Sequence, residues 1–239
     1  MAYGSQPRWT DRSAATQVGI DVGLRDYMLR VYNYMASALA LTGIVAWVFA
    51  GYLETHRAIL HSPVMWLIIL APLGLVMLLS FGIGRLSAAA SQGIFWLYAG
   101  LMGLSLSTIF LAYTGASIAR VFFITAGTFA AMSLYGYTTR RDLSQMGSFL
   151  FMGLIGIVIA MLVNVFLHSP GLQFAISVIG VLVFVGLTAY DTQSIKEMYY
   201  EGDGYEMASK KSIMGALRLY LDFVNLFMFL LQFMGVRRD

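Results

Sequence analysis

The sequence contains no cysteine and few charged residues. The absence of cysteine from its 239 residues excludes a disulfide framework, a thiolate metal site and a cysteine nucleophile. Charged residues make up 11% of the chain and apolar residues 59%, whereas a soluble domain has roughly 25% and 45–50%. So little charge cannot cover the surface of a globular protein of this length in water. We therefore expect lipid to solvate much of the surface.

Signatures of the common enzyme classes are missing as well. The sequence has no P-loop, no Gly-x-Ser-x-Gly nucleophile elbow and no HExxH zinc motif. We therefore expect neither an enzyme nor a bound cofactor. The net charge of +3 comes with 15 Lys and Arg residues spread over loops, which indicates membrane topology rather than nucleic-acid binding.

The apolar residues fall into seven segments. Each is near the ~20 residues that cross ~30 Å of hydrocarbon. The first exceeds the roughly 7–15 residues of a signal-peptide core, so we expect it to be retained as a span. We predict an all-α polytopic membrane protein, with an N-terminal tail at 1–28, one seven-helix transmembrane domain at 29–235 and a short tail at 236–239. The segments are 29–53, 63–83, 93–113, 119–138, 146–168, 173–195 and 212–234.

The basic residues predict the orientation of the chain, because cytoplasmic loops carry an excess of Lys and Arg. With seven spans, ten of the Lys and Arg residues lie on the face that carries the N-terminus, so we expect this face to be cytoplasmic. An odd number of spans then predicts that the C-terminus lies outside. If one span were re-entrant, the C-terminus would change sides. The ten are Arg8, Arg12, Arg25, Arg30, Arg85, Arg140, Arg141, Lys196, Lys210 and Lys211, against Arg57, Arg120, Arg237 and Arg238.

Two isolated carboxylates lie inside the spans, Asp191 in the sixth and Asp222 in the seventh. A carboxylate at bilayer depth costs about 2.5–3.5 kcal/mol on insertion scales, so it usually faces the protein interior and has a function. If the sixth helix ends near Tyr200 and the seventh starts near Ser212, both carboxyls lie roughly 14–15 Å from the loop between them. We therefore expect them to meet at one depth.

Two carboxyls in contact in a poorly hydrated interior do not both ionise easily, so they tend to share one proton. Loss of that proton leaves two charges that repel, and the helices then separate or take up a cation. The pair is thus predicted to be a proton-sensitive joint. The alternative is that each Asp only accepts a hydrogen bond from a neighbouring helix.

Two arginines are placed to act on the pair. Arg85 closes the second span on the predicted cytoplasmic face, where it either reaches back to a carboxylate or simply sets topology. Arg218 precedes Asp222 by four residues, which favours an i,i+4 ion pair. Asn225 lies one turn beyond and offers a carbonyl oxygen to a passing cation.

Three stretches are distinctive: GLMGLSLSTIFLAYTGASIARVFFITAGTFAAMSLYGYTTRRDLS, VFVGLTAYDTQSIK and GALRLYLDFVNLFMFLLQFMG. Together they resemble the Bax inhibitor-1 family, or transmembrane BAX inhibitor motif family, in its bacterial inner-membrane branch. The resemblance implies a seven-helix fold with a central C-terminal helix, and a pH-sensitive calcium leak. It places the family's aspartate pair on Asp191 and Asp222, and its latching arginine on Arg85. Arg218 is a departure, because related sequences commonly have a neutral residue there.

The leading hypothesis is a passive Ca²⁺ leak channel of the bacterial inner membrane, with protons and Ca²⁺ as its ligands. Asp191 and Asp222 act as pH sensor and transient Ca²⁺ ligands, Arg85 or Arg218 as latch, and the seventh helix as plug. Calcium comes from the resemblance alone. The second hypothesis is a regulatory protein that binds a membrane protease or another membrane partner, and the third is a proton-coupled transporter.

Overall fold

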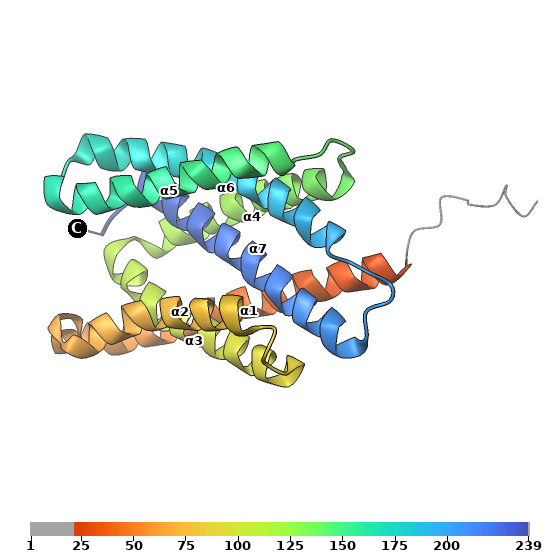
Figure 1. Cartoon of the computed structure of the whole chain (residues 1–239). Coiled ribbons are helices and arrows are strands. Elements are labelled where there is room, and N and C mark those ends of the chain that lie inside the picture. The colour runs from red at the N-terminus through yellow and green to blue at the C-terminus, as the bar shows by residue number, and fades with distance from the viewer. Residues whose placement is uncertain (1–21, 239) are drawn as a thin grey trace, which may run out of the picture.

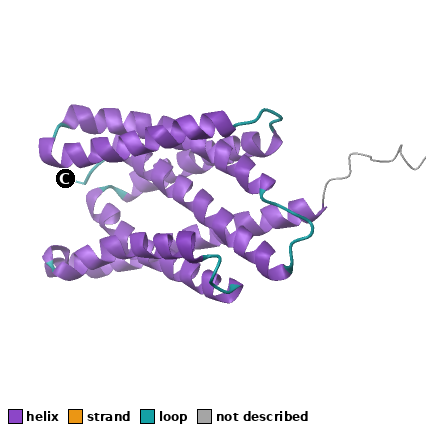
Figure 2. Ribbon diagram, viewed as in Figure 1, coloured by secondary structure: helices purple, strands orange, loops and turns teal. Residues whose placement is uncertain are grey.

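The computed structural model describes residues 22–238, which form seven α-helices and one short 3-10 helix (Figures 1 and 2). Each α-helix is long and apolar enough to cross a membrane, which confirms the predicted all-α polytopic membrane fold. In chain order the elements are α1 (Val22–Thr55), η1 (Arg57–His61), α2 (Pro63–Gly82), α3 (Ala88–Ala112), α4 (Gly115–Thr138), α5 (Ser144–Leu167), α6 (Pro170–Glu197) and α7 (Tyr205–Met234).

Local sequence explains where several helices begin. Pro63 and Pro170 stand in the first turns of α2 and α6, where the missing N–H of proline has no intrahelical partner to lose. The side chains of Ser87, Thr114 and Ser169 accept hydrogen bonds from the first turns of α3, α4 and α6. These caps satisfy backbone donors that lipid could not satisfy.

Helix α7 occupies the centre of the bundle. It runs diagonally between a group made of α1, α2 and α3 and a group made of α4, α5 and α6 (Figure 1), and it packs against α1, α3, α4 and α6. In its most apolar stretch 67% of the residues are buried, compared with 11% in α5. The C-terminal helix is therefore central, as predicted.

Most helix ends differ from the predicted segments, those of α1, α6 and α7 among them. Helix α1 already begins at Val22, seven residues before the first predicted apolar segment, and residues 1–21 of the predicted tail lie outside the described part. Helix α6 ends at Glu197 rather than near Tyr200. Helix α7 starts at Tyr205 rather than near Ser212, because its first two turns are polar and extend beyond the apolar segment.

The chain after α7 is tied to the turn between α3 and α4. The backbone N–H of Thr114 donates to the carbonyl of Val236 over 3.0 Å, and that of Val236 donates to the hydroxyl of Ser117 over 2.8 Å. The N–H of Arg238 donates to the carbonyl of Ala112 over 3.0 Å. Residues 236–238, predicted as a tail, are thus an anchored segment, which we call the C-terminal strap.

Two glycines let the neighbouring helices approach α6 closely. A Cβ on Gly136 of α4 would run into the backbone carbonyl of Ala189, and a Cβ on Gly147 of α5 would run into the ring of Tyr190. Such small residues allow close backbone contact between transmembrane helices. Because Asp191 follows directly, this close packing constrains the backbone from which its carboxyl group extends.

Candidate functional site: the carboxyl pair between helices α6 and α7

The side chains of Asp191 and Asp222 meet between α6 and α7, where the two carboxyl groups are within reach of a mutual hydrogen bond. An ionised carboxylate only accepts hydrogen bonds, so a bond between two carboxyls requires one proton. The structure therefore brings together the two acids that the sequence singled out.

The route to this contact differs from the one predicted. Asp191 lies six residues before the end of α6 at Glu197, about 9 Å along the helix, and Asp222 lies 17 residues after the start of α7 at Tyr205, about 26 Å along it. The carboxyls are therefore not equally far from the ends of their helices, as we had expected. They meet because α7 starts well beyond the end of α6 and crosses the bundle diagonally (Figure 1).

Asp222 is the more deeply buried of the two. Its side chain belongs to a residue that is only 4% exposed, whereas Asp191 is partly exposed. The Oδ2 atom of Asp222 has no hydrogen-bond partner among the described residues. A buried acceptor without a donor is costly, which makes this oxygen a natural ligand for a proton or a cation.

Arg218 is the cation whose charge acts on both carboxyls. It is exposed, although Leu217 and Leu219 on either side are buried. The expected i,i+4 ion pair with Asp222 is absent from the ion pairs of residues 22–238, which join Lys210 to Glu206, Lys211 to Asp203 and Arg238 to Glu54. Arg218 thus acts on the pair through space rather than in contact, because its long side chain turns to the exposed side of α7.

Arg85 lies in the turn between α2 and α3 and is exposed. Its backbone N–H donates to the carbonyl of Gly82 over 2.8 Å. Its side chain takes part in none of the ion pairs of the described residues, and its charge is not among those that act on either carboxyl. Its role as a latch remains a prediction.

Asn225 adds only limited ligand capacity near the pair. Its Nδ2 donates to the carbonyl of Leu221 over 2.8 Å, which leaves the side-chain oxygen for another partner. Within residues 22–238 no group of three or more His, Cys, Asp or Glu side chains is arranged to hold a metal ion. Ca²⁺ prefers six to eight oxygen ligands, so two carboxyls and one amide fit a passing ion better than a resident one.

Contacts between hydroxyl groups join other helices to α6 and α7. Tyr32 of α1 contacts Ser133 of α4 at 2.6 Å, and Ser133 contacts Thr192 of α6, the residue after Asp191, at 3.0 Å. Thr42 of α1 contacts Tyr220 of α7 at 2.8 Å. Isolated Tyr, Ser and Thr residues are too common in membrane helices to predict such networks from spacing alone.

Tyr27 of α1 was also missed. The charges of Arg218 and Asp203 both act on its hydroxyl group, and its ring lies 5.7 Å from that of Tyr199. Tyr27 and Asp203 line a pocket of about 240 Å³ between the start of α1 and the loop before α7.

Comparison with known proteins gives matches along nearly the whole chain. A family model described as "Inhibitor of apoptosis-promoting Bax1" matches residues 24–239. Inner membrane protein YbhL of Escherichia coli K12 is 52% identical over 219 residues, which cover 90% of this chain and 94% of YbhL. Protein RP147 of Rickettsia prowazekii is 53% identical over 92% of this chain and 93% of its own length. A protein of Caulobacter vibrioides is 42% identical over 93% of each chain.

Proposed function

Since this chain belongs to the Bax inhibitor family of membrane proteins, we propose that it is a pH-sensitive calcium leak channel gated by the Asp191–Asp222 pair. YbhL carries the name of an inner membrane protein, and we place this chain in the bacterial inner membrane too. The proposal involves no enzymatic step and no cofactor. Calcium as the ion rests on the resemblance of the Asp-bearing stretches to the family.

The observation that carries the proposal is the contact between the buried carboxyl of Asp222 and the partly buried carboxyl of Asp191, on the two most buried helices, α7 and α6. One proton holds this contact together. When it leaves, two negative charges face each other in a low-dielectric interior, where their repulsion is far larger than in water. Either the helices move apart locally or a cation enters to balance the charge.

Several charged and titratable groups face the pair or its surroundings. Arg218 of α7 offsets part of the negative charge. The charges of Arg218 and of Asp203, in the loop before α7, both act on Tyr27 of α1. Asp203 is itself paired with Lys211. These groups adjust the pH at which the pair loses its proton, while the two carboxyls are the ones that switch.

Calcium flux into proteoliposomes tests the proposal. The purified chain is reconstituted with a calcium-sensitive dye inside, and flux is recorded between pH 5.5 and 8.5. We expect the native chain to show a pH-dependent flux, and Asp191→Asn and Asp222→Asn to flatten that dependence. Asparagine keeps the size of the side chain but cannot exchange a proton.

Asp142→Asn is the matched control, because Asp142 lies in the exposed loop between α4 and α5. Hydrogen bonds from the hydroxyl and the backbone N–H of Ser144 hold the pKa of Asp142 below its usual range. It is therefore ionised throughout the tested pH range and contributes no step. A pH profile that survives both pair variants would rule out the gating role of Asp191 and Asp222.

The same preparation separates the other hypotheses. A chain without flux that crosslinks to one specific membrane protein is a regulatory protein instead. A chain that concentrates a solute under an imposed pH gradient is a proton-coupled transporter, because a passive channel cannot accumulate its ion.

A further inference from the structure

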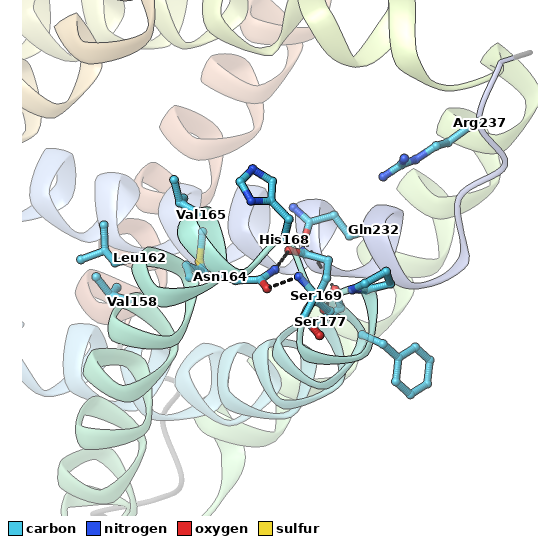
Figure 3. A pocket seen from close by; sticks show the side chains of 13 residues that line it. Val158, Leu162, Asn164, Val165, His168, Ser169, Ser177, Gln232 and Arg237 are labelled. Atoms are coloured by element: carbon cyan, nitrogen blue, oxygen red, sulfur yellow. Dashed lines mark hydrogen bonds between the residues drawn. The ribbon is translucent and has the colours of Figure 1, made fainter.

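A second site lies at the other end of the bundle, where α5 turns into α6 and α7 ends (Figure 3). It is a pocket of about 1030 Å³. One wall is apolar and exposed, with Leu162 and Val165 of α5 and Phe174 of α6 each at least 60% exposed. On a membrane protein such side chains face lipid acyl chains, so this wall alone says nothing specific.

Three pocket-lining side-chain amides are joined by successive hydrogen bonds, and we call this series the floor of the pocket. Asn164 donates from Nδ2 to Oε1 of Gln173 over 3.1 Å, and Gln173 donates from Nε2 to Oε1 of Gln232 over 2.7 Å. Asn164 also accepts from the backbone N–H of Ser169 over 3.0 Å. Because the Oε1 of Gln232 accepts within this series of bonds, the Nε2 of this pocket-lining residue is left to donate to another partner.

The side chains of Arg237 and His168 line the same pocket. Arg237 extends from the C-terminal strap toward the side of the pocket where His168 and Gln232 lie (Figure 3). The strap holds the backbone on both sides of Arg237. Its neighbour Arg238 is paired with Glu54 at 3.0 Å, whereas Arg237 has no ion pair among those of residues 22–238.

The lining carries no negative charge. None of the described residues that line the pocket is Asp or Glu. An arginine on an anchored backbone, an amide donor in the same lining and no competing carboxylate are together complementary to a phosphate oxygen. The positive-inside rule predicts that this end of the bundle lies at the non-cytoplasmic surface of the inner membrane, at the level of lipid headgroups.

We propose that this pocket binds one anionic phospholipid of the surrounding leaflet. The phosphodiester accepts hydrogen bonds from Arg237 and Gln232, with His168 beside it, and one acyl chain lies along Leu162, Val165 and Phe174. A free phosphate ion would leave the apolar wall unused. The site is separate from the carboxyl pair, and neither proposal depends on the other.

Native mass spectrometry of the detergent-purified chain tests this site. The chain is mixed with phosphatidylglycerol or with zwitterionic phosphatidylcholine, and bound lipid is counted at increasing collision energy. We expect one phosphatidylglycerol to remain bound after phosphatidylcholine has left. Arg237→Gln should weaken that binding about ten-fold, the loss expected for one charge-assisted hydrogen bond. Arg237→Lys should restore part of it, because it keeps the charge but not the fork of donors.

Two further variants separate a specific site from general attraction of anionic lipid. Arg120→Gln removes an exposed arginine of α4 that does not line the pocket, and it should leave the tightly bound lipid in place. His168→Asn removes the ring while keeping a residue that tolerates the left-handed backbone, where φ is 48°. This variant should weaken binding less than Arg237→Gln does.

Three results would overturn the proposal. They are equal retention of the two lipids, equal losses for Arg237→Gln and Arg120→Gln, and displacement of the lipid by millimolar inorganic phosphate. The last result would identify a soluble anion as the ligand. If Arg237→Gln did not fold, the comparison of Arg237→Lys with Arg120→Gln would still decide between site and surface.

Discussion

If Asp191 and Asp222 share one proton, calcium must compete with that proton for the same oxygens. A pair that holds a single proton between its carboxyls loses that one H⁺ when one Ca²⁺ enters. Metal binding to groups that must first deprotonate is linked to pH in this way. For a one-for-one exchange, a ten-fold rise in Ca²⁺ lowers the midpoint of the pH profile by about one unit once calcium exceeds its dissociation constant.

Two measurements check this exchange. In the first, proteoliposome flux is recorded against pH at three calcium concentrations that differ by successive factors of ten. In the second, a pH-indicator dye reports the protons released when calcium is added to the chain in weakly buffered detergent. The expected release is about half a proton per ion bound at the midpoint measured without calcium, approaches one proton below that pH, and vanishes in Asp222→Asn. A midpoint that stays fixed across the calcium range would refute the shared oxygens, even if flux itself depended on pH.

Three other changes follow from the structure. Arg218→Met removes the charge that acts on both carboxyls and should move the flux midpoint to higher pH by about one unit. Arg85→Met should move this midpoint little. A larger shift in Arg85→Met than in Arg218→Met would identify Arg85 as the latch. Gly136→Val should overpack α4 against α6, which lowers the free energy of unfolding by about 1–3 kcal/mol and lowers the midpoint of thermal denaturation. Gly127→Ala should leave that midpoint unchanged, because the new Cβ meets open space. Thr42→Val removes the hydroxyl contact between α1 and α7. It should lower the free energy of unfolding by about 1–3 kcal/mol in the same assay, because the hydroxyl of Tyr220 is left buried without this partner. An unchanged denaturation midpoint would contradict this.

The number of helices was predictable because lipid imposes it. A chain that crosses hydrocarbon must supply about 20 apolar residues per span, so the seven apolar segments map directly onto α1 to α7. The helix ends were less predictable. The first turns of α7 contain Lys210 and Lys211, and hydropathy cannot show that a helix continues through polar residues outside the apolar segment.

The site was predictable in its members but not in its geometry. An acid at membrane depth is rare enough that Asp191 and Asp222 stood out from composition alone. Helix spacing placed Arg218 on the same side of α7 as Asp222, but an ion pair also depends on the rotamer of a long side chain, and Arg218 turns to the exposed side instead. The contacts of Tyr27 and Thr192 arise from packing between helices far apart in sequence, which local patterns do not encode.

The shared proton between Asp191 and Asp222 can be observed most directly by infrared difference spectroscopy. Spectra of the reconstituted chain at pH 5.5 and 8.5 are subtracted in the region of the protonated carboxyl C=O stretch. We expect one band that disappears at high pH in the native chain, and that is shifted or lost in both Asp191→Asn and Asp222→Asn but kept in Asp142→Asn. An identical band in the native chain and in both pair variants would show that the proton is held elsewhere, and the proposed gate would then be wrong.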